Sequence, residues 1–134
     1  MIQPARIALR MAGLLLAVLV AGACSDPSTI CAADSPPAVV IEVRDRVTGD
    51  FTPPVARGVV QDGEFQDSLR LWEWIEAEPI MPMSYAAAHE RPGTYSAHLE
   101  VAGYESWDSS GIVVLRDECH VITQRFTAAL QPAS

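Results

Sequence analysis

Alternation of apolar and polar side chains constrains the fold of this chain more than any other feature. In residues 39–47 the apolar side chains Val39, Ile41, Val43 and Val47 alternate with Val40, Glu42, Arg44 and Arg46. A period of two places the first set on one face of a β-strand. The same pattern recurs in residues 95–101. We therefore expect two strands that each bury one face.

Other segments that contain apolar residues and are bounded by turn residues predict the remaining strands. They cover residues 55–61, 64–74, 112–115 and 119–130. Asp62-Gly63 is a strong hairpin signal between the first two. Closely spaced strands without an amphipathic helix of normal length are typical of a sandwich. The fold class that we predict is all-β, a small antiparallel β-sandwich of about seven strands.

Residues 75–88 are harder to interpret, because Pro79, Pro82 and the run Ala86-Ala87-Ala88 mix loop and helix preferences. We expect mostly a long loop here. Loops displayed by a rigid sandwich often carry recognition. The segment 75–90 is therefore our candidate contact surface for a partner.

Residues 1–23 have the pattern of an export signal peptide. Arg6 and Arg10 charge its start, residues 11–20 are apolar, and the small residues Ala21-Gly22-Ala23 follow. A transmembrane helix is the alternative. It would need about 20 consecutive apolar residues, and Arg10 and Asp26 leave this segment short.

The segment Val20-Ala21-Gly22-Ala23-Cys24 resembles the bacterial lipobox, in which the cysteine is acylated and becomes the mature N-terminus. It departs from the usual pattern at Ala21, where leucine is favoured. The resemblance implies a palmitate-bearing lipoprotein anchored at Cys24 to the cell membrane or outer membrane, facing the periplasm or exterior. Ser25 resembles the residue that follows the cysteine in lipoproteins sorted to an outer membrane. Ordinary signal-peptidase cleavage is the alternative.

The chain has three cysteines, and an exported chain with an odd number leaves one unpaired. Lipidation of Cys24 would remove the odd one. Cys31 and Cys119 then remain, and we predict that they form a disulfide in an oxidising compartment. The alternatives are a bond between Cys31 and Cys24, or free thiols.

The mature chain would be strongly acidic. The full chain carries 9 cations, all arginine, and 17 acidic residues. Removal of residues 1–23 takes away two arginines and no acidic residue, which leaves 7 against 17, or −10. Such a surface repels polyanions and anionic lipid headgroups, so nucleic acid is not an expected partner.

The mature chain divides into a tether and one domain. Residues 24–37 are rich in small, polar and proline residues and have no periodicity, which predicts a lipid-anchored flexible tether. Residues 38–131 then form the sandwich, and a chain of 134 residues has room for no second domain.

Four segments of the domain carry a family resemblance. They are Val39-Val40-Ile41-Glu42-Val43-Arg44-Asp45 with Gly49, Asp62-Gly63-Glu64-Phe65, Pro92-Gly93-Thr94-Tyr95, and Ala102-Gly103-Tyr104-Glu105-Ser106-Trp107. Together they resemble carboxypeptidase regulatory-like domains, which are transthyretin-like β-sandwiches. The resemblance implies a non-catalytic module that supports folding, adhesion or ligand contact, and it carries over no catalytic motif.

The aromatic residues are the best indication of a contact site. Trp72 and Trp74 stand at alternate positions of one expected strand, and flat aromatic surfaces bind sugar rings or partner side chains. The alternative is that both belong to the core. Met83 and Tyr85 lie in the expected loop and complete our set of possible ligand contacts.

Metal-binding patterns are weak. His98 and His120 with Glu100 or Glu118 offer zinc-ligand types but none of the tight spacings of zinc sites. The acidic residues at 73, 76 and 78 lack the aspartate-rich order of a calcium loop. We expect no metal and no other cofactor.

Catalytic patterns are equally weak. No serine has a Gly-x-Ser-x-Gly setting, and His89-Glu90 is a common adjacent pair. We expect no enzyme activity. The chain is interpreted as a non-catalytic lipoprotein of the cell envelope that binds an envelope protein or has a structural role. A carbohydrate-binding module that uses the tryptophans is the alternative, and a small metal-dependent enzyme is the third.

Overall fold

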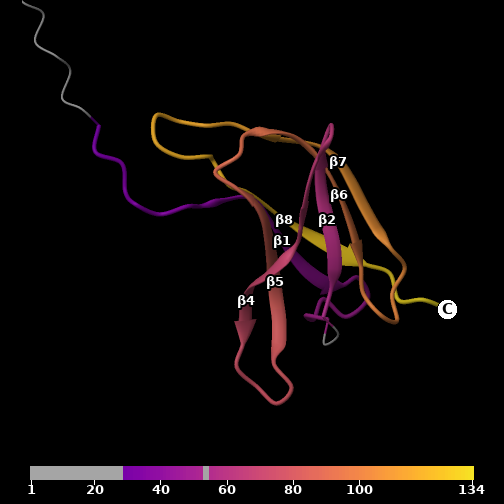
Figure 1. Cartoon of the computed structure of the whole chain (residues 1–134). Helices are drawn as coiled ribbons and strands as arrows, with labels where there is room; N and C mark the ends of the chain where they lie inside the picture. The colour runs from indigo at the N-terminus through magenta and orange to yellow at the C-terminus, as the bar shows by residue number, and fades with distance from the viewer. Residues whose placement is uncertain (1–28, 53–54) are drawn as a thin grey trace, which may run out of the picture.

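The computed structural model describes residues 29–52 and 55–134, and these form an all-β sandwich (Figure 1). One sheet has the strand order β4-β5-β1-β8 and the other β3-β2-β6-β7. No helix in the described part is long and apolar enough to cross a membrane. The strands are β1 (Pro37–Asp45), β2 (Arg57–Asp62), β3 (Phe65–Ser68), β4 (Arg70–Ile75), β5 (Met81–His89), β6 (Gly93–Glu100), β7 (Trp107–Val114) and β8 (Gln124–Leu130).

Strand β1 is central in the first sheet and confirms the prediction from alternation as far as Val43, whereas Val47 lies in the turn beyond the strand and is exposed. It pairs antiparallel with β5 and parallel with β8. Val39, Ile41 and Val43 are buried in the core between the two sheets. Val40 lies on the outer face of the sheet and is buried as well. Other side chains therefore cover the outer face of the sheet at Val40.

The predicted hairpin at Asp62-Gly63 is confirmed. Strands β2 and β3 pair antiparallel with Asp62 opposite Phe65, and Gly63 has a φ of 60°. Such a positive φ suits glycine, which has no side chain to clash in that conformation. Strand β6 covers the predicted alternating segment 95–101 except for Val101, which is buried just beyond the end of the strand.

The prediction of a single strand over residues 64–74 is wrong, because the segment forms two strands that lie in different sheets. Strand β3 pairs with β2 in the second sheet, whereas β4 pairs with β5 in the first. Leu69 separates them and is buried, and its N–H donates to the Gly58 carbonyl at 2.9 Å. The chain thus crosses between the two sheets at Leu69.

The prediction of a long loop over residues 75–88 is also wrong, because most of it forms β5. Both faces of this strand are buried from Ser84 to Ala88, so it lacks the alternation that identifies a half-exposed strand. Pro82 lies beyond Glu42↔Ser84, the last pair with β1 at this end. A missing N–H is tolerated there, since β5 has a neighbour on one side only.

The ends of the last two strands also differ from the prediction. Strand β7 begins at Trp107 instead of residue 112. Its first half includes the polar residues Asp108 and Ser109, which pair with β6 although they do not continue the apolar pattern. Strand β8 begins at Gln124, and residues 115–123 form the loop between β7 and β8. That loop carries Cys119.

Candidate functional site

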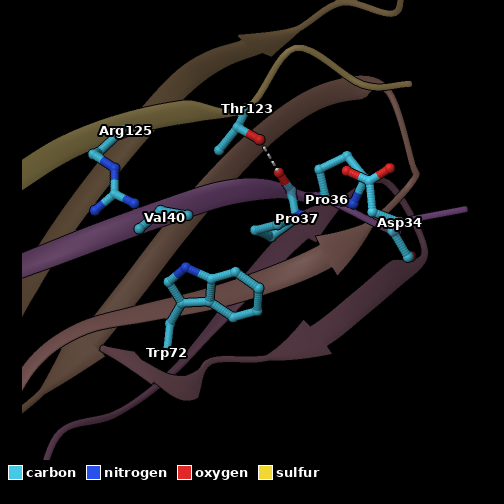
Figure 2. Close-up of a pocket in the computed structure, with 8 residues that line it drawn as sticks. Asp34, Pro36, Pro37, Val40, Trp72, Thr123 and Arg125 are labelled. Atoms are coloured by element: carbon cyan, nitrogen blue, oxygen red, sulfur yellow. Dashed lines mark hydrogen bonds between the residues drawn. The ribbon is translucent and has the colours of Figure 1, made fainter. Parts of the chain in front are cut away.

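An open pocket of about 480 Å³ lies on the outer face of the β4-β5-β1-β8 sheet (Figure 2). Its lining comes from β1, β4 and β8, from the segment ahead of β1, and from the end of the loop between β7 and β8. The lining residues are Asp34, Ser35, Pro36, Pro37, Val40, Trp72, Thr123 and Arg125.

Trp72 forms one side of the pocket and is 41% exposed. Its indole lies beside the imidazole of His89, with ring centroids 5.7 Å apart. Figure 2 shows the indole next to Val40, which is only 1% exposed and forms the floor. The predicted role of Trp72 in ligand contact stays a prediction, and its position at a pocket fits that role.

Arg125 from β8 forms another side and is held by Glu73 from β4. Its two terminal nitrogens lie 2.7 and 3.3 Å from the two carboxylate oxygens of Glu73. Glu73 also accepts a hydrogen bond of 2.5 Å from the buried hydroxyl of Ser84. Arg125 and then Ser84 lower the pKa of Glu73, and Glu73 in turn raises the pKa of Arg125. Both groups are therefore charged at neutral pH.

The remaining side of the pocket is residues 34–37, which lie against the domain through three hydrogen bonds. The Thr123 hydroxyl donates to the Pro37 carbonyl at 2.7 Å, as Figure 2 shows. The backbone N–H of Glu90 donates to Pro36 at 3.0 Å, and Nδ1 of His89 donates to Ser35 at 2.7 Å. The backbone carbonyls of three consecutive residues, 35 to 37, are therefore held by the domain.

The second half of the expected flexible tether is thus held in place, which corrects that part of the prediction. The predicted disulfide between Cys31 and Cys119 is present, with Cα atoms 5.3 Å apart. Nε2 of His120 lies 3.0 Å from the Ala32 carbonyl and 3.4 Å from Asp34. The sequence of this segment does not reveal these bonds, because their partners, Cys119 and His120, lie near the other end of the chain.

Trp74 lies outside the pocket, at the tip of the β4–β5 hairpin. It is 48% exposed, and the neighbouring Ile75 and Ile80 are 45% and 46% exposed. Trp74 and Ile80 line a shallow hollow of about 370 Å³ together with Glu76, Ala77 and Glu78. We call residues 74–80 the hairpin tip.

Met83 and Tyr85, our other two possible contacts, lie in β5. Met83 is half-buried. Tyr85 is 1% exposed, and its hydroxyl accepts a hydrogen bond of 2.9 Å from the N–H of Ala56. Tyr85 is therefore a core residue and is withdrawn as a ligand contact. An expected loop leaves Tyr85 at the surface, whereas in strand β5 its side chain faces the core.

The histidines considered as metal ligands have separate partners. His98 lies between Asp108 at 2.7 Å and Glu100 at 3.3 Å on the other sheet. His120 binds Glu90 in the loop region. Within the part of the chain that the structure describes, no three His, Cys, Asp or Glu side chains are arranged so that they could hold a metal ion. Glu90 faces His120 and His89 faces Ser35, so the adjacent pair does not act as one unit.

Sequence reasoning missed Arg125, Thr123 and Asp34. They become neighbours of Trp72 because β8 pairs with β1, Thr123 directly precedes β8, and Asp34 lies in the segment just ahead of β1. Only the sheet order reveals this. Cys24 lies outside the described residues. A comparison with known protein families finds no matching family model, and a comparison with curated proteins finds no similar protein.

Proposed function

We propose that the protein is a non-catalytic binding module of the bacterial cell envelope, anchored through a lipid on Cys24, that contacts a partner protein with its hairpin tip. The observation that carries the proposal is the exposure of Trp74 and Ile80, which line one hollow at that tip, with the exposed Ile75 next in the chain after Trp74. Exposed apolar groups that lie together mark interaction sites, whereas single ones are ordinary.

The disulfide supports the proposed location outside the cytoplasm. Bonds such as that between Cys31 and Cys119 persist in oxidising compartments and are rare in the cytosol. The apolar N-terminal segment and Cys24 supply the proposed route and anchor. The resemblance to carboxypeptidase regulatory-like domains is in accord with a module that binds rather than catalyses.

The tip and the chain entry lie at opposite ends of β5. This strand pairs with the start of β1 at His89 and with the end of β4 at Met81 (Figure 1). Nine residues of strand separate those ends by about 30 Å. A domain held at the membrane by its N-terminal segment can therefore extend the tip away from the anchor.

Charge favours a protein partner with a basic rim. Glu76 and Glu78 are exposed beside the apolar side chains of the tip. They repel anionic headgroups and polyanions, but they attract arginine and lysine side chains around an apolar patch. Aromatic residues such as Trp74 are typical anchors at the centre of such interfaces.

The anchor is tested by intact mass spectrometry of the protein recovered from bacterial membranes. We expect a chain that begins at Cys24 and carries acyl groups. A Cys24→Ala variant is the control and should lose both the added mass and the membrane fraction. An unmodified Cys24 in the mature chain would refute the anchor.

The contact is tested by photocrosslinking in living cells, because amine reagents find no lysine in this chain. A photoreactive residue at Ile80 should give one dominant protein adduct. The matched control replaces Val113, which is similarly exposed at 53% but lies on β7 of the other sheet. Equal adducts from both positions, or none from Ile80, would contradict a partner at the tip.

A further inference from the structure

The Trp72 pocket is separate from the hairpin tip and has a chemistry of its own. We propose that it binds a neutral sugar ring of an envelope glycan, which stacks on Trp72 and hydrogen-bonds to Arg125 and Asp34. This binding does not depend on the protein contact proposed for the tip.

The indole of Trp72 provides the stacking surface. It is 41% exposed at the pocket although His89 lies beside it. The face of an aromatic ring is electron-rich, and the C–H groups on one face of a sugar ring carry partial positive charge. A sugar ring can lie on this surface while its hydroxyl groups point outward to the rim.

The size and floor of the pocket fit a small ring. Its volume is about 480 Å³, within the range of pockets that hold small ligands. Val40 and the prolines at 36 and 37 form apolar lining next to the indole. Figure 2 shows Trp72, Arg125 and Pro37 arranged around Val40. An apolar lining with a few polar groups is the usual composition of a small-molecule site.

The polar rim contains both a donor and an acceptor. Arg125 uses one hydrogen on each terminal nitrogen to bind Glu73, which leaves further N–H donors on the guanidinium. Asp34 is an exposed carboxylate and so an acceptor. A sugar hydroxyl both donates and accepts, so a single ring matches both groups.

The charges favour a neutral ligand over an anionic one. The positive charge of Arg125 is balanced by Glu73 across the sheet, with Glu42 nearby. Asp34 adds a negative charge at the rim. An acidic sugar would meet little net attraction at Arg125 and repulsion from Asp34.

A proline-rich peptide is the main competitor for a pocket with an exposed tryptophan. Proline has no N–H, so such a segment presents mainly carbonyl acceptors. Those acceptors suit Arg125 but leave Asp34 without a donor. The rim therefore favours a sugar over this peptide class.

The attachment of residues 34–37 prepares the pocket before the ligand binds. Three hydrogen bonds, from Thr123, Glu90 and His89, hold that side, and the disulfide at Cys31 holds the chain just ahead of it. A preformed site loses less conformational entropy on binding. Reduction of the disulfide should therefore weaken sugar binding in the folded protein.

The test is isothermal titration of the full chain, solubilised in a zwitterionic detergent that has no sugar headgroup. The probes are the β-1,4-linked N-acetylglucosamine dimer, maltose and mannobiose, with a proline-rich decapeptide as competitor. We expect at least one disaccharide to bind. Trp72→Ala should raise its Kd by about tenfold or more, since the stacking surface is lost.

Trp74→Ala is the matched control, because it removes the other exposed tryptophan of the same strand and should change the Kd by less than about twofold. Asp34→Asn tests the rim and should weaken binding at a temperature at which its melting curve shows the variant to be fully folded. Absence of binding by all three disaccharides would overturn the proposal. Equal losses in the two tryptophan variants, or Trp72-dependent binding of the peptide alone, would overturn it as well.

Discussion

Cys31 and Cys119 are joined by a disulfide that links the segment ahead of β1 to the loop between β7 and β8. The bond closes a loop of 88 residues, which includes most of the domain. Beside it, His120 binds the Ala32 carbonyl, so the same loop holds the chain twice. The outer side of the pocket therefore depends on a contact made near the other end of the sequence.

Loss of the disulfide should strongly destabilise the domain. For a loop of this length the chain-entropy model gives about 4 to 5 kcal/mol of lost stability. We expect Cys31→Ser, Cys119→Ser and the double variant to show equal losses in urea denaturation, since either single change breaks the same bond. A clearly larger loss in the double variant would argue against the pairing.

Tyr85 should contribute more to stability through its hydroxyl than Tyr104 does. The Tyr85 hydroxyl is the acceptor for the N–H of Ala56 in the core, so Tyr85→Phe leaves a buried donor unpaired and should cost about 1 to 3 kcal/mol. Burial raises the pKa of Tyr85.

Tyr104→Phe is the matched control. Its hydroxyl donates to Asp45 at 2.9 Å in a partly buried position, where water can replace the lost bond. We expect a loss of about 1 kcal/mol or less. Equal losses for the two variants in chemical denaturation would contradict the role assigned to Tyr85.

Period-two patterns predicted the strands that bury one face. In β6, Tyr95, Ala97 and Leu99 are buried while Ser96 and Glu100 are exposed, so the pattern and the burial coincide. The same reasoning failed for β5. There Ala86 packs on the outer face and Ala87 in the core, and a strand buried on both sides has no alternation to detect.

The candidate site was predicted only in part for a related reason. Trp72 and Trp74 stood out by residue type, but the sequence could not show that one lies at a pocket and the other at a hairpin tip. β-Bulges between Leu71 and Trp74 shift the register of β4, so simple alternation does not fix their directions. Arg125 lies near Trp72 only because of the order of the strands in the sheet. Asp34 lies near Trp72 because it comes just ahead of β1, in the middle of that sheet.

Gly58 should be a position at which even a methyl group is costly. A Cβ there would lie 2.3 Å from the His98 carbonyl oxygen and 3.1 Å from Leu99 Cα, so the backbone pairing of β2 with β6 would have to move. We expect Gly58→Ala to destabilise the domain by about 3 kcal/mol, at the upper end of overpacking effects.

Gly63→Ala separates crowding from backbone strain. This glycine has open space around its Cβ position but a φ of 60°. Its loss should be about 1 to 2 kcal/mol, the cost of that conformation for a residue with a side chain. If Gly63→Ala destabilised the domain more than Gly58→Ala in thermal denaturation, the close approach of β2 and β6 would not explain Gly58.

Stability should also depend on the protonation of His120. Its Nδ1 binds the Glu90 carboxylate and its Nε2 the Ala32 carbonyl, so both ring nitrogens face acceptors and only the doubly protonated ring satisfies both. Glu90 chiefly raises the pKa of His120 above its ordinary value of about 6.5, with help from Asp34. Nη1 of Arg116 lies 3.6 Å from the other oxygen of Glu90.

A raised pKa in the folded state means that folding favours the protonated ring. The contribution is complete below the pKa of the unfolded chain and is lost as the pH rises through the folded value. The melting temperature of the wild type should therefore exceed that of His120→Gln at pH 5.5, and the difference should shrink by pH 8.5.

His98→Gln is the control for the NMR titration of His120. Asp108 and then Glu100 raise the pKa of His98 at a separate site, so this variant leaves the surroundings of His120 unchanged. NMR titration should give a midpoint above 6.5 for His120 in both the wild type and His98→Gln, and a midpoint at or below about 6.5 would rule out the pairing with Glu90.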